Sequence, residues 1–94
     1  MAADRKWPTT VDEAVRVLHR LLPEDEQRKI AEMAEDDLIL MHFGLGAWIR
    51  NNLGLWQGNT ALQAATGESD ADGASSAILM ALWLSLRPTP PKLH

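Results

Sequence analysis

The sequence predicts an all-α protein, a compact bundle of four to five helices around a central apolar helix at about residues 36–52. Apolar residues recur at helical spacing through most of the 94-residue chain, and no strand-like alternation is found. Capping residues and helix stops divide the chain into short segments. Residues 38–67 carry one formal charge, that of Arg50, so we expect this stretch to supply much of the hydrophobic core.

The first predicted helix runs from about residue 10 to residue 22. Thr10 is its expected N-cap and Glu13 stands three residues later, which is the spacing of a capping box. Pro23 ends this helix, because the residue before a proline resists the α conformation. The same proline can open a second, short helix, in which the acids at positions 24–26 suit the positive end of the helix dipole.

The third predicted helix, at about residues 36–52, is apolar on almost every side: Leu38, Ile39, Leu40, Met41, Phe43, Leu45, Ala47, Trp48 and Ile49. A helix of this kind is surrounded by other elements, which is why we expect it at the centre of the bundle. It also contains Gly44 and Gly46. Each glycine costs up to about 1 kcal/mol relative to alanine, and this cost indicates a close approach by another backbone or by a ligand.

Two further helices are expected after Gly54, which ends the third helix. Thr60 is the predicted N-cap of a short helix that Gly67 stops. A last helix at about residues 74–86 carries an apolar stripe, and the acid that caps it is either Asp70 or Asp72.

The chain is expected to form a single helical domain at residues 10–87, between an extended N-terminal entry at 1–9 and a Pro-rich disordered tail at 88–94. Its net charge of -4 argues against nucleic acid and against a membrane surface as partners. No secretory signal is visible, and the longest uncharged apolar run has ten residues, about half of a bilayer span. Together with the absence of cysteine, these features favour the cytoplasm.

No recognisable catalytic, cofactor or metal motif is found. The lack of cysteine excludes thiolate zinc sites and cysteine nucleophiles, and the histidines lack metal-ligand spacing. No nucleotide-binding glycine loop and no nucleophile elbow is present. We therefore expect no cofactor and no metal, and we favour a non-enzymatic role while leaving an enzyme open.

The candidate binding residues gather around the third predicted helix. His42, Gly46 and Arg50 fall at positions i, i+4 and i+8, so an imidazole and a guanidinium flank a gap on one stripe. Such a stripe suits an anion or a polar ligand. Four further candidates follow in the sequence. Asn51, Asn52 and Asn59 supply amide groups, and Trp56 supplies a flat aromatic ring on which a ligand could stack.

Each candidate also has a structural interpretation, which the sequence leaves open. His42 can be a hydrogen-bonded core residue, since buried polar groups are normally satisfied. Asn51 and Asn52 can be helix caps, and Trp56 can be a packing residue. Arg50 can tie two helices together by pairing with one of the acids Glu35, Asp36 or Asp72.

Residues 42–56, which read His-Phe-Gly-Leu-Gly-Ala-Trp-Ile-Arg-Asn-Asn-Leu-Gly-Leu-Trp, resemble a family of small bacterial proteins classed as a domain of unknown function. The matching signature is His-Phe-x-Leu-Gly, then Ile-Arg-Asn, then Gly-Leu-Trp. The resemblance covers most of the chain except its two ends, and Leu53 departs from it at a position that is usually aromatic. It implies a compact helical protein from a bacterium and no established activity.

Two functions fit these observations. The first is an interaction module that binds a protein partner or self-associates through the uncharged region 38–67 and its tryptophans. The second is a protein that binds a small anionic ligand, or an enzyme that acts on one, in a pocket formed by His42, Arg50, Asn51 and Trp56.

Overall fold

The structure, a computed structural model, describes residues 7–87 and confirms the all-α class. These residues form α1 (Val11–Leu21), α2 (Glu24–Glu32), η2 (Glu35–Met41), η3 (His42–Gly46), α3 (Ala47–Asn52), α4 (Thr60–Thr66) and α5 (Ala71–Leu86). The predicted tail at 88–94 and most of the predicted entry, residues 1–6, lie outside the described residues. Within 7–87, no helix combines the length and the apolar character needed to cross a membrane.

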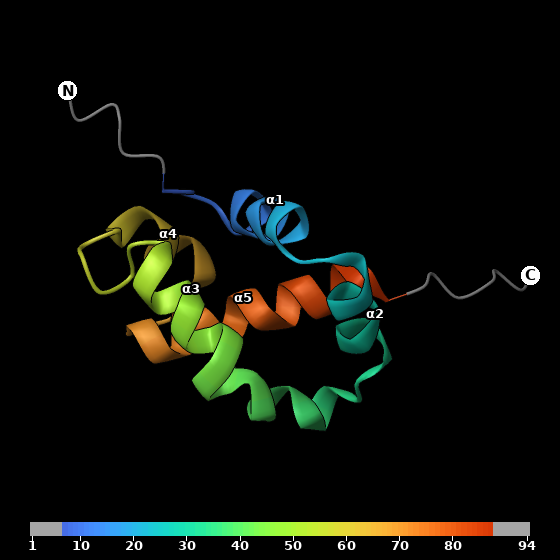
Figure 1. Ribbon diagram of the computed structural model, residues 1–94. Helices are drawn as coiled ribbons and strands as arrows, with labels where there is room; N and C mark the ends of the chain where they lie inside the picture. The colour runs from blue at the N-terminus through green and yellow to red at the C-terminus, as the bar shows by residue number, and fades with distance from the viewer. Residues whose placement is uncertain (1–6, 88–94) are drawn as a thin grey trace, which may run out of the picture.

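The central element is α5, which packs against every other helical segment of the described chain. Figure 1 shows it running through the middle, with α1 on one side and the arch of η2 and η3 on the other. Its buried residues are Ala71, Ala74, Ser75, Ile78, Leu79, Leu82 and Trp83. The helix begins at Ala71, earlier than predicted, and Asp70 caps it by accepting a hydrogen bond from the Gly73 N–H at 2.7 Å.

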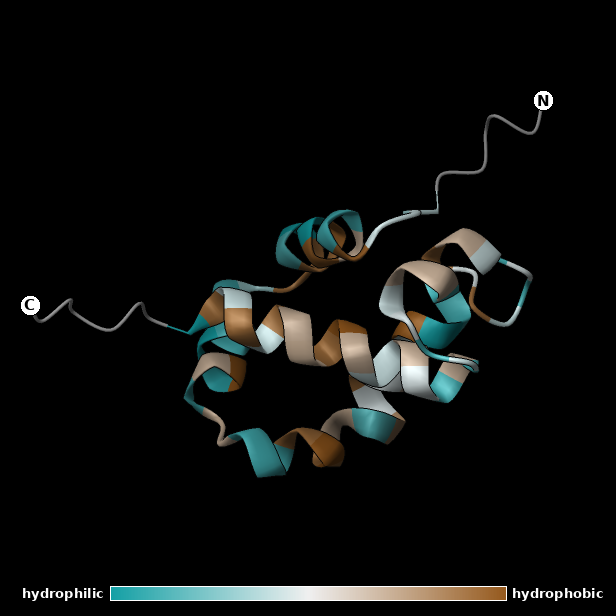
Figure 2. Ribbon diagram, turned by 180° about the vertical axis from the view of Figure 1, so that it is seen from behind, coloured by the Kyte–Doolittle hydropathy of each residue, from teal (hydrophilic) through white to brown (hydrophobic). Residues whose placement is uncertain are grey.

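The prediction of one central helix at residues 36–52 is wrong. This stretch is divided into a 3₁₀-helix, a π-helical turn and a short α-helix, and its first part lies at the edge of the protein. A 3₁₀-helix repeats every three residues, so Leu38 and Met41 both turn toward the core while Ile39 and Leu40 turn outward. Figure 2 shows this hydrophobic stretch on the arch that lies away from α1.

Thr10 caps α1 as predicted, because its hydroxyl accepts a hydrogen bond from the Glu13 N–H at 3.1 Å. The Glu13 carboxylate, however, accepts from the backbone N–H of Thr9 at 2.9 Å rather than from that of Thr10. This hydrogen bond lowers the pKa of Glu13 below its ordinary value. The start of α1 is therefore fixed by two residues before the helix.

The prediction that Thr60 caps α4 is wrong by one residue. Asn59 is the N-cap, and its side-chain oxygen accepts from the Leu62 N–H at 3.3 Å. The predicted stop at Gly67 is confirmed, with a φ of 77°, and Gly54 follows α3 with a φ of 84°. Both are left-handed conformations, which glycine adopts without a steric penalty.

Candidate functional site

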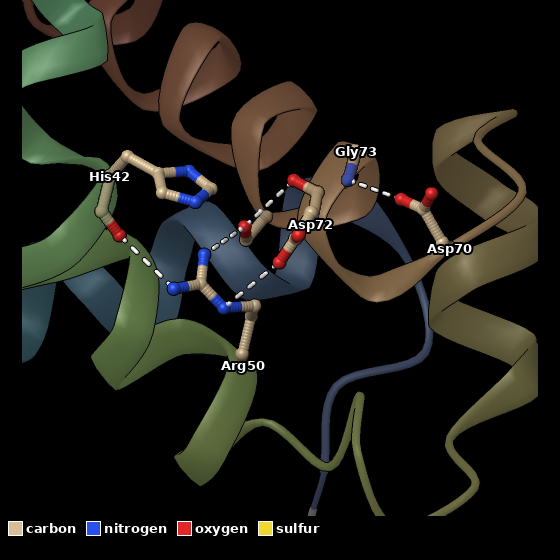
Figure 3. Close-up of polar contacts among 6 residues, drawn as sticks. His42, Arg50, Asp70, Asp72 and Gly73 are labelled. Carbon is tan, nitrogen blue, oxygen red and sulfur yellow. Dashed lines mark hydrogen bonds and ion pairs between the residues drawn. The ribbon is translucent and has the colours of Figure 1, made fainter.

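Arg50 is a buried arginine with protein partners on three of its atoms (Figure 3). It lies on α3 and is 6% exposed. Its Nη1 donates to the Ser75 hydroxyl at 2.9 Å, its Nη2 donates to the His42 carbonyl at 3.2 Å, and its Nε lies 3.5 Å from an Asp72 carboxylate oxygen. The structural interpretation of Arg50 thus fits the geometry, with Asp72 rather than Glu35 or Asp36 as its acid.

This network joins three elements. The His42 carbonyl belongs to η3, while Ser75 and Asp72 belong to the first turns of α5. The Ser75 hydroxyl also donates to the Asp72 carbonyl at 2.9 Å, so it is used both as donor and as acceptor. Because buried polar groups are costly unless paired, the network holds the irregular segment before α3 against the central helix.

Gly46 provides the space for the Arg50 guanidinium. A Cβ at this position would lie 3.2 Å from Arg50 Nη1, 3.3 Å from the Met41 carbonyl oxygen and 3.5 Å from a Leu79 methyl group. Other atoms therefore approach Gly46 closely, as predicted, and these atoms belong to the protein itself rather than to a ligand. Gly44 differs, because a Cβ there would meet nothing within 4 Å.

The two glycines should respond oppositely to substitution. Gly46→Leu is expected to lower the free energy of unfolding by about 1–3 kcal/mol, because the new side chain overpacks the Arg50 contact. Gly44→Ala should instead raise it by about 0.5–1 kcal/mol, since alanine restricts the unfolded chain and its Cβ meets open space. Urea unfolding of both variants measures these changes. A Gly46→Leu protein as stable as wild type would show that the space beside Arg50 is not filled.

The remaining candidates, Asn51, Asn52, Trp56 and Asn59, take no part in the Arg50 network. Asn59 is buried, and its side-chain nitrogen donates to the carbonyls of Pro8 at 2.9 Å and Leu53 at 2.8 Å. Asn52 donates to the Trp48 carbonyl at 2.9 Å within α3. The other two candidates turn toward solvent, and these are Asn51 and Trp56.

A groove that the sequence analysis missed lies between α5 and the arch of η2 and η3. Its inner part is a cavity of about 200 Å³, lined by Leu38, Ile39, His42, Ser76, Leu79 and Met80. Its outer part is a wider hollow of about 520 Å³, lined by Ile39, His42, Phe43, Glu68, Asp70, Asp72, Gly73 and Ser76. Because three residues line both parts, they form one continuous surface, which we call the α5 groove.

The two ends of the α5 groove differ in chemistry. The inner end is mainly apolar, whereas the outer end carries the carboxylates of Glu68, Asp70 and Asp72. Within residues 7–87 no group of three or more His, Asp or Glu side chains is placed to hold a metal ion. The carboxylates make the outer end an acidic surface.

His42 stands where the two ends meet. Its ring is half-buried and lies edge-on to the Phe43 ring, with the ring centroids 4.9 Å apart. The imidazole makes no hydrogen bond to any described side chain or backbone group, although its carbonyl serves Arg50. The imidazole can therefore donate a hydrogen bond to a molecule in the groove or accept one from it.

The groove could not be found from the sequence because its residues had local explanations. By sequence, Asp70 and Asp72 are alternatives for one helix cap, and Ile39 and Phe43 fit an apolar helix in the core. The sequence feature that could have indicated the groove is the three-residue spacing of Leu38 and Met41. In a 3₁₀-helix, residues at this spacing lie on one side, so only that side is buried. That spacing is too short to distinguish a 3₁₀-helix from an α-helix.

Comparison with known proteins identifies one family. A family model described as a domain of unknown function (DUF6794) matches residues 7–86. No curated protein and no solved structure matches the chain significantly.

Proposed function

Since the chain belongs to the DUF6794 family, a domain of unknown function, we propose its role from the geometry alone: a non-enzymatic interaction module that binds another protein. The observation that carries this proposal is the exposure of three large apolar side chains on one short segment. Ile39 is 75% exposed, Leu40 is 74% exposed and Phe43 is 86% exposed. We call these three residues the apolar ridge.

The apolar ridge differs from the other exposed apolar residues. Leu21, Trp56 and Leu84 are also exposed, but no two of them share a segment, because they lie on α1, on a loop and on α5. Exposed apolar residues spread over different elements are normal, although Leu21 also borders an apolar hollow with Leu45 and Trp48. Grouped aliphatic and aromatic side chains are instead typical of the centre of a protein interface. The ridge is therefore a candidate for the centre of a binding surface.

Charge favours a different protein over a second copy of this chain. Each copy has a net charge of -4, and the exposed acids Glu35, Asp36 and Asp37 precede the ridge, separated from it in sequence by Leu38 alone. Two ridges brought together would also bring these like charges together, which opposes self-association. The proposed partner is accordingly a distinct protein with a complementary, less acidic surface.

The anionic-ligand alternative receives less support. Arg50 already contacts the protein through all three guanidinium nitrogens, and carboxylates line the neighbouring groove. The proposal also includes a bacterial source, which rests on the resemblance of residues 42–56. The cytoplasmic location in the proposal rests on the lack of cysteine together with the short longest apolar run, which is about half of a bilayer span.

Photo-crosslinking in cells tests the proposed module. A photoreactive phenylalanine analogue at position 43 is expected to give an adduct of defined mass, larger than the chain and different from two copies of it. The same analogue at Gln57, an exposed residue after α3, is the matched control and should not give this adduct. Ile39→Ser should abolish the adduct while leaving the thermal unfolding midpoint nearly unchanged, because Ile39 is exposed.

Three outcomes would contradict the proposal. They are the absence of any adduct from position 43, the same adducts from positions 43 and 57, and an adduct whose mass equals two copies of the chain. The last would replace the distinct partner with self-association.

A further inference from the structure

The α5 groove adjoins the apolar ridge, since Ile39 and Phe43 belong to both. We infer that the groove receives a segment of the partner protein that places an apolar side chain in the inner end and a lysine or arginine in the outer end. This inference rests on the proposed function and adds the chemistry of the partner to it. It follows from the shape of the inner end and the charge of the outer end.

The inner end is built from core side chains. Leu38 is 8% exposed and Leu79 is 4% exposed, so these walls are fixed by the packing of η2 on α5. Met80 is half-buried beside them, and a methionine side chain adapts to different apolar shapes. The cavity of about 200 Å³ thus suits one large aliphatic or aromatic side chain better than a polar group.

The outer end has a negative charge that the protein itself only partly offsets. Glu68, Asp70 and Asp72 line it and are all exposed, and its lining includes no lysine or arginine. The nearby Arg50 guanidinium is paired with Asp72, and the N-terminus of α5 adds a partial positive charge of about one half. The net charge of the outer end therefore remains negative, so it attracts a cationic side chain and repels a phosphate or a carboxylate.

The arrangement also sets a direction for the partner segment. The apolar end lies beside Leu79 and Met80 in the middle of α5, and the acidic end lies at its N-terminus. A bound segment therefore runs along α5, and the imidazole of His42 is available for a hydrogen bond between the two ends.

Binding of labelled peptides, measured by fluorescence polarisation, tests this inference. One set of short peptides combines leucine or phenylalanine with arginine at varied spacing. A second set replaces the arginine with glutamate, and a third replaces the apolar residue with serine. We expect saturable binding only from the first set, and we expect added salt to weaken it.

Variants of the protein separate the two ends. Glu68→Gln with Asp70→Asn should weaken binding about threefold to tenfold, because exposed charge pairs contribute modestly and asparagine still caps α5. Asp25→Asn with Glu32→Gln removes the same charge from α2 and should change affinity less than about twofold. Met80→Ala should weaken binding about fivefold or more, because it removes one wall of the inner end and leaves the acids of the outer end in place.

Equal binding of the arginine and glutamate peptides would overturn the inference, and so would equal losses from the two double variants. If no peptide binds while position 43 still forms its adduct, the inference is wrong and the proposed function stands. If position 43 forms no adduct, the proposed function itself is contradicted.

Discussion

Arg50→Ala is expected to lower the free energy of unfolding by about 2–4 kcal/mol. The substitution leaves a cavity beside Gly46 and removes the donors to the Ser75 hydroxyl and the His42 carbonyl. It also frees Asp72 from its ion pair. Equilibrium unfolding in urea, followed by circular dichroism, measures the loss, and the slope of the transition should remain that of wild type.

Two further variants separate the contributions of Arg50. Arg50→Met keeps much of the aliphatic volume, so its loss should be smaller than that of alanine and should reflect the hydrogen bonds. Asp72→Asn should cost less than about 1 kcal/mol, because the Asp72 side chain is 63% exposed and its ion pair is screened by solvent. An Arg50→Ala protein with wild-type stability would contradict a structural role and would favour the anionic-ligand alternative.

Leu82→Ala is expected to cost about 2–5 kcal/mol, because Leu82 is fully buried in the C-terminal half of α5 and its truncation leaves a cavity. Leu40→Ala is the matched control on η2. Leu40 is 74% exposed, so the same chemical change there should alter stability by less than about 0.5 kcal/mol. Thermal and urea unfolding of the pair compare the two positions directly.

The comparison tests which helix is central. Had residues 36–52 formed the central helix, truncation of Leu40 would also be costly. A large loss at Leu40 together with a small loss at Leu82 would contradict the arrangement in Figure 1. With α5 at the centre, we expect a large loss of stability at Leu82 and a small one at Leu40.

The sequence by itself determined the class of the protein and most of its helix ends. Thr10, Gly54 and Gly67 act through the backbone within one turn of the chain, so their effect is readable without tertiary structure. Pro23 likewise separates α1 from α2, although it is the extended N-cap of α2 rather than its first helical residue. Even here, neighbouring polar residues compete, and Asn59 rather than Thr60 caps α4 because its amide also reaches the Pro8 and Leu53 carbonyls.

For the candidate site, the sequence supplied the residues but not their roles. The spacing of Gly46 and Arg50 correctly places a gap beside a guanidinium, and Asp72 was among the possible acids. The spacing could not say that the Ser75 hydroxyl and the His42 carbonyl would take the remaining donors. Those partners come from segments that meet only when α3 packs on α5.

Only the tertiary structure decided which apolar segment occupies the centre. Residues 36–52 and α5 are both rich in apolar side chains, and hydrophobicity does not rank two such segments. Burial is settled by which surfaces pack together, and α5 contacts all the other helical segments while η2 buries one side only. The apolar ridge and the α5 groove result from that choice, because the side chains of η2 and η3 that do not reach α5 remain in solvent.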